Sequence, residues 1–363
     1  MFVIVNYIRL KNFRCFDDYK LDLKKRFVFI QGNNGSGKTS LLEAIYYSCY
    51  VKSFRTRFNT ELINFDKKHF FVQVEFDESD TGHKIQAGFS QKDGKLIKLN
   101  DKPIKSYKEI ASIYKVINVA ENDLSIVNQG PSERRTFLNQ SLFLLNSDYV
   151  FKLRKYKQIL DQRNAFLLTK MSLNNELLAW TNQLWELSLE MQEERKKFLR
   201  NIEIIVNKLL YNYFDDLEIN FFYNSKNIDV HNFEEFWKFY KDNIYAKEAK
   251  WRRSLFGLHL DDFSISFKQK KARIFASRGQ QKLILLLLKI AQILALKNKS
   301  DNLCLLIDDF FTDFDKQKIR KFFSIFNDLK CQIFITSPME TIEAFLDIQD
   351  FDRNDFQVIK LIQ

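Results

Sequence analysis

The sequence predicts an α/β fold in which one lobe comes from both ends of the chain and a mainly helical lobe is inserted between them. Near the N-terminus an apolar run precedes a glycine-rich motif at residues 32–39, and near the C-terminus the apolar run Leu303–Ile307 ends in two aspartates. Between them, residues 133–213 contain no glycine or proline and carry apolar residues at helical spacing. We therefore expect one lobe built from residues 1–115 and 256–363 and an inserted lobe of residues 116–255.

The composition indicates a folded protein with a polyanionic partner. The 363 residues are 45% hydrophobic, which is enough for two lobes with sizeable cores. Lysine and arginine number 57 against 46 aspartates and glutamates, so the formal net charge is +11. This excess favours nucleic acid as a partner, and the charge alone leaves DNA, RNA and a membrane surface open.

Two classes of protein, membrane proteins and disulfide or zinc scaffolds, are disfavoured. Residues 1–11 alternate apolar and polar side chains, as in a strand and unlike a signal peptide. The longest apolar run, Leu283–Leu296, is interrupted by Lys289 and Gln292 and is too short to span a bilayer, so we expect a cytoplasmic protein. The cysteines form no CxxC pair, and we expect core thiols at Cys15, Cys49, Cys304 and Cys331.

The first 115 residues read as strands around one helix. Alternating or continuous apolar patterns predict strands at Phe2–Leu10, Lys20–Leu23, Phe27–Ile30, Val72–Phe76 and Ile85–Phe89. We expect the first turn near Asp17 and Asp18, and a helix from Lys38 to about Tyr50.

The remaining segments are helical first and α/β afterwards. From Leu173 to Met191 the helical pattern covers barely two heptads, which favours a helix packed in a lobe over an extended coiled coil. In the last third we expect, in order, a helix at Gln281–Lys297, a strand at Leu303–Ile307, a helix at Lys316–Leu329 and a strand at Gln332–Thr336.

The glycine-rich motif predicts a nucleotide phosphate site. Residues 32–39 fit GxxxxGK[ST] between an apolar strand and an amphipathic helix, and they hold three of the nine glycines. Glycine lets successive N–H groups surround phosphate oxygens, Lys38 reaches the β- and γ-phosphates from an accessible loop, and Thr39 ligates Mg²⁺. The alternative is a plain turn before a helix. The expected nucleotide-binding residues are Gly32, Asn33, Asn34, Gly35, Ser36, Gly37, Lys38, Thr39 and Ser40.

The aspartate pair after Leu303–Ile307 predicts the metal and water chemistry of the same site. Carboxylates at the carboxyl end of a buried strand are where a nucleotide-bound Mg²⁺ is held. Asp308 is the expected metal ligand together with Thr39, and Asp309 is the expected catalytic carboxylate that orients or deprotonates the attacking water, with Lys38 as its catalytic partner. The alternative is an acidic cap of a following helix.

A third segment, Ser277–Gln280, stands directly before the long apolar helix. Ser277, Gly279 and Gln280 would place a hydroxyl, an exposed N–H group and an amide at a helix N-terminus, where anions bind. In isolation, an ordinary serine cap is the preferred interpretation of the segment. The order of the motifs along the chain favours a nucleotide contact.

That order resembles the ABC-type ATPases and, within them, the RecF family of recombination-repair proteins. The resemblance covers nearly the whole chain and is carried by Arg9–Arg14, Ser53–Thr56, Glu133–Leu138, Gln162–Asn164, Ala276–Gln281 and Asp308–Asp315. It implies an ABC-type P-loop ATPase lobe with ATP and Mg²⁺ as cofactors, and an inserted lobe without a long coiled coil.

The sequence departs from the family pattern in two places. Gly257–Asp262 resembles the family's G-P-H-R-D-D but has Leu258 and Leu260 in place of proline and arginine, and Asn139 replaces an aspartate. These changes concern a DNA or interlobe contact rather than ATP binding. His259 is expected to be structural, because a single imidazole makes a poor metal site.

Three basic clusters, Lys92–Lys115, Lys152–Lys157 and Lys268–Lys282, are candidates for contacts with duplex DNA. Each can also be read as a solvated face. No helix-turn-helix or zinc-finger signature indicates base readout, so binding to phosphates independent of sequence is expected.

The resemblance implies a weak, DNA-stimulated ATPase whose hydrolysis acts as a switch. ATP would join the P-loop of one subunit to the Ser277 segment of another, closing an ATP-dependent homodimer on double-stranded DNA at gaps or single-strand/duplex junctions. RecO and RecR are the implied partners in loading RecA during recombination, DNA repair and the SOS response, with no membrane involved.

Three other functions remain open from the residues themselves. An SMC-like chromosome ATPase would need long coiled-coil arms, and the insertion lacks that length. The ATPase subunit of a membrane transporter would be recognised by a membrane subunit that co-purifies. A DNA-binding scaffold with a nearly inactive ATP site would bind ATP without steady-state hydrolysis.

Overall fold

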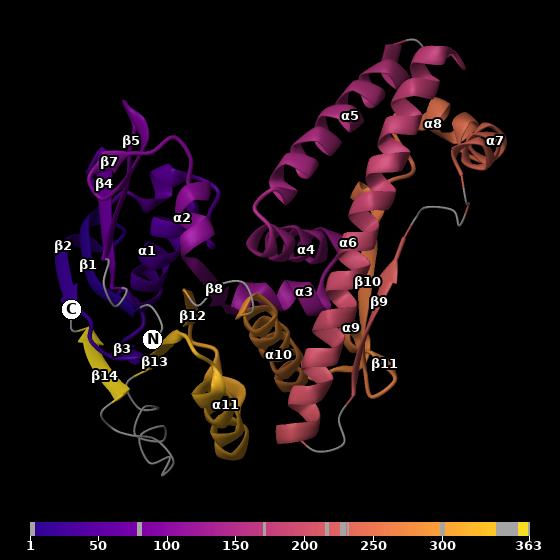
Figure 1. The fold of residues 1–363 in the computed structure, drawn as a ribbon. Coiled ribbons are helices and arrows are strands. Elements are labelled where there is room, and N and C mark those ends of the chain that lie inside the picture. Colours follow the sequence, from indigo (N-terminus) through magenta and orange to yellow (C-terminus); the bar gives the residue numbers. More distant parts are fainter. Residues whose placement is uncertain are drawn as a thin grey trace. The chain divides into compact units, whose positions relative to one another are not determined.

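The computed structural model describes residues 4–77, 82–169, 172–214, 218–225, 230, 232–297, 302–338 and 355–361. The chain divides into two compact units (Figure 1). Unit 1 is Met1–Leu124, Lys208–Asp216 and Ser277–Gln363, and unit 2 is Ser125–Asn207 and Leu217–Ala276. The expected lobe boundaries differ from these units, because residues 116–124 and 208–216 belong to unit 1 and residues 256–276 to unit 2.

Unit 1 contains a parallel five-stranded sheet in the order β14-β3-β13-β12-β8. Its strands are β3 (Phe27–Gly32), β8 (Lys115–Val119), β12 (Leu303–Ile307), β13 (Gln332–Ser337) and β14 (Phe356–Leu361). All residues of β3, β12 and β13 are buried, as expected for apolar strands covered on both faces. The sequence patterns predict these three strands and miss β8 and β14, and the pairing of β8 with β12 explains why the boundary lies beyond residue 115.

A second sheet of unit 1 has six strands in the order β2-β1-β4-β5-β6-β7 and is antiparallel. The strands are β1 (Ile4–Phe13), β2 (Phe16–Asp22), β4 (His69–Asp77), β5 (His83–Ser90), β6 (Gly94–Leu99) and β7 (Lys102–Pro103). The expected first turn at Asp17 and Asp18 is wrong. Phe13 pairs with Phe16, so the chain turns at Arg14 and Cys15, and the two aspartates lie exposed on β2.

The helices of unit 1 include α1 (Lys38–Tyr50), α2 (Lys108–Ile113), α10 (Arg278–Lys297) and α11 (Lys316–Asp328). Helix α1 has the predicted bounds. Within the described part of the chain, α10 is the helix that is long enough and apolar enough to cross a membrane, by length and composition only. The expectation that its apolar run is too short to span a bilayer is therefore wrong. However, 72% of that apolar window is buried inside the structure, as in the core helix of a soluble protein.

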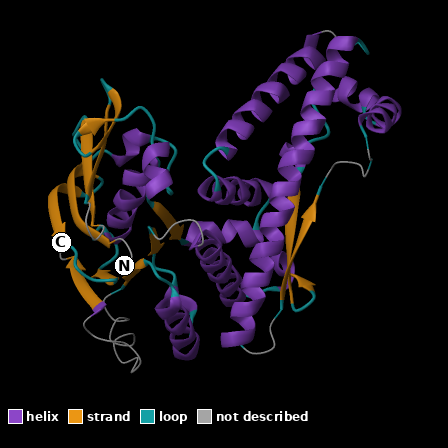
Figure 2. Cartoon of the chain, viewed as in Figure 1, coloured by secondary structure: helices purple, strands orange, loops and turns teal. Residues whose placement is uncertain are grey.

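Unit 2 is mainly helical, as Figure 2 shows, with a three-stranded sheet in the order β11-β10-β9. Its elements are α3 (Ser125–Asn128), α4 (Pro131–Leu145), α5 (Tyr149–Thr169), most of α6 (Asn175–Tyr213), β9 (Ile219–Asn224), α7 (Phe233–Asn243), α8 (Tyr245–Trp251), β10 (Asp262–Phe267), β11 (Lys270–Lys271) and α9 (Ala272–Phe275). From Lys208 on, α6 belongs to unit 1. The pairing of β10 with β9 draws the residues after 255 into this unit.

Helix α6 is 39 residues long, more than the two heptads that the sequence pattern suggests. Its apolar stripe packs inside the structure, since Leu177, Leu184 and Met191 are fully buried. The described residues thus contain a long helix and no extended coiled coil, as predicted.

The cysteines are free thiols, and three of them, Cys49, Cys304 and Cys331, are buried. Burial raises the pKa of Cys49 and of Cys331 to about 12, so both stay protonated and behave as small apolar groups. Cys15 is exposed in the β1–β2 turn, so the expectation of a core thiol is wrong at that position.

Candidate nucleotide-binding site

The loop between β3 and α1 needs glycine where the sequence supplies it. A Cβ atom at Gly32 would lie 2.3 Å from the Ser36 Oγ, and one at Gly37 would lie 2.7 Å from the Cys15 Sγ. Gly35 and Gly37 have φ angles of 88° and 96°, in the left-handed region that side chains disfavour. The loop is therefore compact, and its backbone can approach a ligand closely.

Lys38 begins α1 and is 7% exposed, so the expectation of a solvent-accessible loop lysine is wrong. Its Nζ donates to the carbonyl oxygens of Gly32, at 2.7 Å, and of Asn33, at 3.1 Å. These two bonds hold the ammonium along the loop, while Asn33, Asn34 and Gly35 are exposed above it. The cation is thereby fixed where the loop would surround phosphate oxygens.

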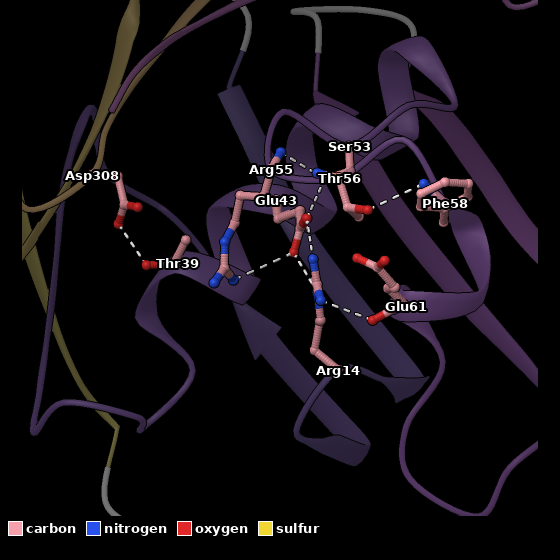
Figure 3. A network of polar contacts seen from close by, with 9 residues as sticks. All are labelled: Arg14, Thr39, Glu43, Ser53, Arg55, Thr56, Phe58, Glu61 and Asp308. Atoms are coloured by element: carbon pink, nitrogen blue, oxygen red, sulfur yellow. Dashed lines mark hydrogen bonds and ion pairs between the residues drawn. The ribbon is translucent and has the colours of Figure 1, made fainter. Parts of the chain in front are cut away.

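The carboxylate of Asp308 lies beside the loop. The Oγ1 of Thr39 and the Oγ1 of Thr336 each donate to the Asp308 Oδ1 at 2.9 Å (Figure 3 shows the Thr39 bond). Burial raises the pKa of Asp308, and the two hydroxyl bonds act against that rise. Since its partners are side chains of α1 and β13, Asp308 does not cap a following helix.

Asp309 has a strained backbone and an unsatisfied side chain. Its φ is 48°, a left-handed conformation that costs energy for a residue other than glycine. Its backbone N–H donates to the Thr336 Oγ1 at 2.8 Å, and its Oδ1 is buried with no hydrogen-bond partner. A buried carboxylate oxygen without a donor is the arrangement expected of a group that serves a ligand or a water molecule.

Thr336 is a residue that the sequence motifs do not identify. Its hydroxyl donates to Asp308 and accepts from the N–H of Asp309, so one side chain fixes both aspartates. The sequence contains one indication of this role, because the predicted strand Gln332–Thr336 ends in a residue with a hydroxyl group. Only the parallel pairing of β13 with β12 shows that the two strand ends lie side by side.

These residues fit a nucleotide with Mg²⁺. The Thr39 hydroxyl donates its hydrogen to Asp308 and keeps its lone pairs for a cation, as the P-loop chemistry requires. The Ser36 Oγ, like the Asp309 Oδ1, is buried with no hydrogen-bond partner, and Ser40 is buried within α1. Two buried oxygens without a hydrogen-bond partner, a fixed lysine and a glycine loop together make a set of donors and acceptors that fits a nucleotide phosphate.

The Ser277 segment forms a reciprocal cap at the start of α10. The backbone N–H of Ser277 donates to the Gln280 Oε1 at 2.9 Å, and the Gln280 N–H donates to the Ser277 Oγ at 3.4 Å. The alternative interpretation of Ser277 as a helix cap thus describes its contacts in this chain. Gly279 has room for a side chain, since an added Cβ would meet the Asp313 carbonyl oxygen at 3.8 Å.

The helix behind this cap is fixed to the loop after Asp309. Lys282 is 1% exposed, and its Nζ lies 2.7 Å from the Asp313 Oδ2 and 3.2 Å from the Glu121 Oε2. Arg278 pairs with the same two carboxylates. Asp315, two residues after Asp313, caps α11 by accepting a hydrogen bond from the Lys318 N–H at 2.8 Å.

A buried carboxylate on α1 forms a second network that sequence analysis misses (Figure 3). Glu43, one turn after Thr39, is fully buried and accepts two bonds of 2.8 Å from Arg14. Ser53 also donates to Glu43, and Arg55 lies 3.8 Å from it. The network ties the β1–β2 turn and the segment after α1 to the helix that carries Thr39.

His259 and Asn139 lie in unit 2 and have structural contacts there. The His259 Nδ1 lies 2.7 Å from the Tyr156 Oη, and burial lowers the pKa of His259. The Asn139 Oδ1 accepts from Arg195 at 2.7 Å. No cluster of histidine, cysteine, aspartate and glutamate side chains that could hold a metal ion occurs among the residues that the structure describes.

Comparisons with known proteins give one consistent result. The RecF/RecN/SMC N terminal domain matches residues 4–348. The DNA replication and repair protein RecF of Clostridium acetobutylicum is 30% identical to this chain, and the match covers 98% of this chain and 97% of that protein. The RecF protein of Acetivibrio thermocellus is 31% identical, and the match covers 92% of each chain. A solved structure named "recombination mediator protein RecF-ATP in RecFOR pathway" superposes with a TM-score of 0.82 at 26% identity, over 97% of this chain and 94% of that one.

Proposed function

Since the chain belongs to the RecF family of DNA replication and repair proteins, we propose that it is an ATP-dependent DNA-binding protein of recombinational repair. The resemblance predicted from the motif order is confirmed, and so is the α/β fold of an ABC-type lobe with an inserted helical lobe. The observation that carries the proposal is the junction of Thr39, Asp308 and Thr336, which brings the two nucleotide motifs of distant chain segments into one site.

Different groups of the chain would bind the phosphates of ATP and its Mg²⁺ ion. Backbone N–H groups of residues 33–37 and the Lys38 ammonium would hold the phosphates, while Thr39 and Asp308 would hold Mg²⁺. Bound there, Mg²⁺ would neutralise charge on the phosphate oxygens. The structure of a relative named for its ATP complex supports ATP as the nucleotide.

Asp309 is proposed to orient the attacking water and accept its proton. Its buried Oδ1 lacks a donor, and its backbone is held by Thr336, so the carboxylate is positioned and available. A carboxylate that is fixed in this way needs little reorganisation when the water attacks. The expected turnover is that of a switch, slow and stimulated by DNA.

The Ser277 segment is proposed to contact ATP held by a second subunit. Among the residues that the structure describes, packing does not require glycine at position 279, because an added Cβ would make ordinary contact there. A glycine at the exposed start of α10 is explained if a phosphate of the partner's ATP approaches the N–H groups of Ser277, Gly279 and Gln280. ATP would then join two subunits, and hydrolysis would separate them.

Duplex DNA at gaps or single-strand/duplex junctions is the proposed substrate of the dimer, and loading of RecA the proposed outcome. The net charge of +11 supports a polyanionic partner. The RecFOR pathway named for the structural relative supports RecO and RecR as partners, and the family's role in replication and repair supports a cytoplasmic location. An SMC-type function is disfavoured, because the described residues contain no extended coiled coil.

The test measures oligomeric state and duplex binding in parallel with ATP, with ADP and without nucleotide. ATP should produce dimers by light scattering and tighter binding to gapped duplex, and ADP should produce neither. Lys38→Ala is the control, since it removes the phosphate-binding cation and should abolish the ATP effect. Equal dimerisation and equal DNA affinity in all three states would refute the ATP-gated model.

A further inference from the structure

Two lysines of the basic clusters, Lys152 and Lys282, are already paired with carboxylates of the protein. Lys152 forms ion pairs with Glu190, at 2.6 Å, and with Glu194. Lys282 is buried against Asp313 and Glu121. These lysines serve the protein's own carboxylates, so neither could bind a phosphate without breaking a pair.

Unlike Lys152 and Lys282, the cations of residues 268–275, which we call the 268–275 patch, are exposed. The patch exposes four cations and two large apolar side chains: Lys268, Lys270, Lys271, Arg273, Ile274 and Phe275. No carboxylate of the described ranges forms an ion pair with any of the four cations, and the sequence has no acidic residue between Asp262 and Asp301. The patch therefore concentrates positive charge that no carboxylate among the described residues neutralises.

The backbone of the patch is defined by pairing. Strands β10 and β11 form a hairpin in which Phe267 pairs with Lys270 (Figure 1). The two turn residues, Lys268 and Gln269, have φ angles of 50° and 61°, the left-handed pair of a tight two-residue turn. Helix α9 follows at once, so the cations are displayed on regular structure.

The apolar side chains lie among these cations. Ile274 is 67% exposed and Phe275 63% exposed, and the Lys270 Nζ is 5.7 Å from the centroid of the Phe275 ring. Cations beside an exposed aromatic ring suit a nucleic acid, because phosphates pair with the cations and a sugar or unpaired base packs on the ring. A second copy of this chain would need a matching acidic surface.

We propose that the 268–275 patch binds the phosphate backbone of duplex DNA and that Phe275 packs against an unpaired base where the duplex ends. The proposal rests on the proposed DNA-binding function and adds the surface and the reason for a preference for junctions. The lysines raise the affinity for any duplex, and the Phe275 ring raises the affinity for gapped DNA above that for continuous duplex.

The first experiment compares two triple variants that remove the same charge from the same unit. One is Lys268→Gln/Lys270→Gln/Lys271→Gln, and the matched control changes the exposed lysines Lys238, Lys241 and Lys247 of α7 and α8 to Gln. Affinity for a duplex closed by hairpins is measured from low to high salt. The patch variant should lose about three units of salt slope, roughly one for each lysine, and bind at least about tenfold more weakly near 0.1 M salt.

The control variant should keep the wild-type salt slope. Equal losses in both variants would overturn the proposal, because net charge alone would then explain binding. An unchanged slope in the patch variant, together with weaker ATP-dependent dimers, would overturn it in favour of a contact with a second copy. If the wild-type protein shows no salt-dependent DNA binding at all, the proposed function itself fails.

The second experiment tests the ring with Phe275→Ala on gapped duplex and on the hairpin-closed duplex. Loss of stacking should weaken binding to the gap about fivefold or more and leave the closed duplex nearly unchanged. Ile274→Ala, at the neighbouring exposed position, should have the smaller effect. Equal effects of Phe275→Ala on both DNAs would overturn the role of the ring.

Discussion

Two pairs of adjacent aspartates, Asp308–Asp309 in unit 1 and Asp261–Asp262 in unit 2, have opposite chemical surroundings. Asp261 is fully buried and accepts from Gln192 at 2.7 Å and from Tyr223 at 2.6 Å. Asp262 accepts two bonds from Arg134, at 2.7 and 2.9 Å.

By contrast, the Asp308 carboxylate accepts from two threonine hydroxyls, and one oxygen of Asp309 has no partner. Within the described ranges, neither carboxylate forms an ion pair with a lysine or arginine. The two pairs look alike as sequence, so residue type alone does not separate a structural carboxylate from a site carboxylate. The difference lies in whether the chain itself satisfies the carboxylate. Removing a satisfied carboxylate should cost stability, and removing an unsatisfied one should cost activity.

The largest effect should come from the unsatisfied pair. Asp309→Asn keeps the size of the side chain but removes its ability to accept a proton, so ATP hydrolysis should fall by about 10²- to 10⁴-fold. ATP binding and the unfolding midpoint should stay close to wild type, since no donor loses its partner. Steady-state hydrolysis and equilibrium nucleotide binding measured on one preparation test this. Full activity would show that Asp309 is not the base.

The reverse is expected for the satisfied pair. Asp262→Ala leaves the buried Arg134 guanidinium without its two charge-assisted bonds and should lower the free energy of unfolding by about 2–3 kcal/mol. ATP binding should persist in the folded fraction. Denaturant titration tests it, with Asp242→Ala on the exposed surface of α7 as a control expected to change stability by less than about 0.5 kcal/mol. A stable Asp262→Ala protein would break the comparison.

Thr336 sharpens the comparison, because its hydroxyl is what orients the unsatisfied pair. Thr336→Val keeps the shape of this buried side chain and removes both bonds, so hydrolysis should fall about 10- to 100-fold and require more Mg²⁺. Thr336→Ser keeps the hydroxyl and should restore most of the rate. A role in packing alone would give the opposite order, with Val active and Ser impaired.

The parts of the molecule predicted from sequence are those whose signals are local. The P-loop, the strand before Asp308 and helix α1 each follow from a few consecutive residues, and the structure has them within one or two positions. Thr336 and Glu43 could not be found in this way, because their roles come from contacts with chain segments far away in sequence. Strand β8 was missed for the same reason, since its pairing with β12 joins residues almost 190 positions apart.

The smallest effect concerns His259, which lies near Asp261 of the satisfied pair. Burial lowers its pKa, opposed by the Ser254 carbonyl and Asp261 and assisted by Arg135 and Arg163. The unfolded chain, with a histidine pKa of about 6.5, therefore binds a proton at a higher pH than the folded chain does. Stability should fall as pH drops below about 6.5, by about 1.4 kcal/mol for each unit by which the folded pKa is lower, and level off below the folded pKa.

His259→Gln removes this titration, so the stability of the variant should depend less on pH than that of the wild type between about pH 8 and pH 5. The difference between the two curves isolates His259 from the protein's other histidines, which both proteins share. Urea titrations at each pH measure it, because urea is uncharged and leaves ionic strength unchanged. Parallel curves would mean that His259 takes up its proton equally in the folded and unfolded chain, and the polar core of unit 2 would then tolerate a charge that its contacts are expected to exclude.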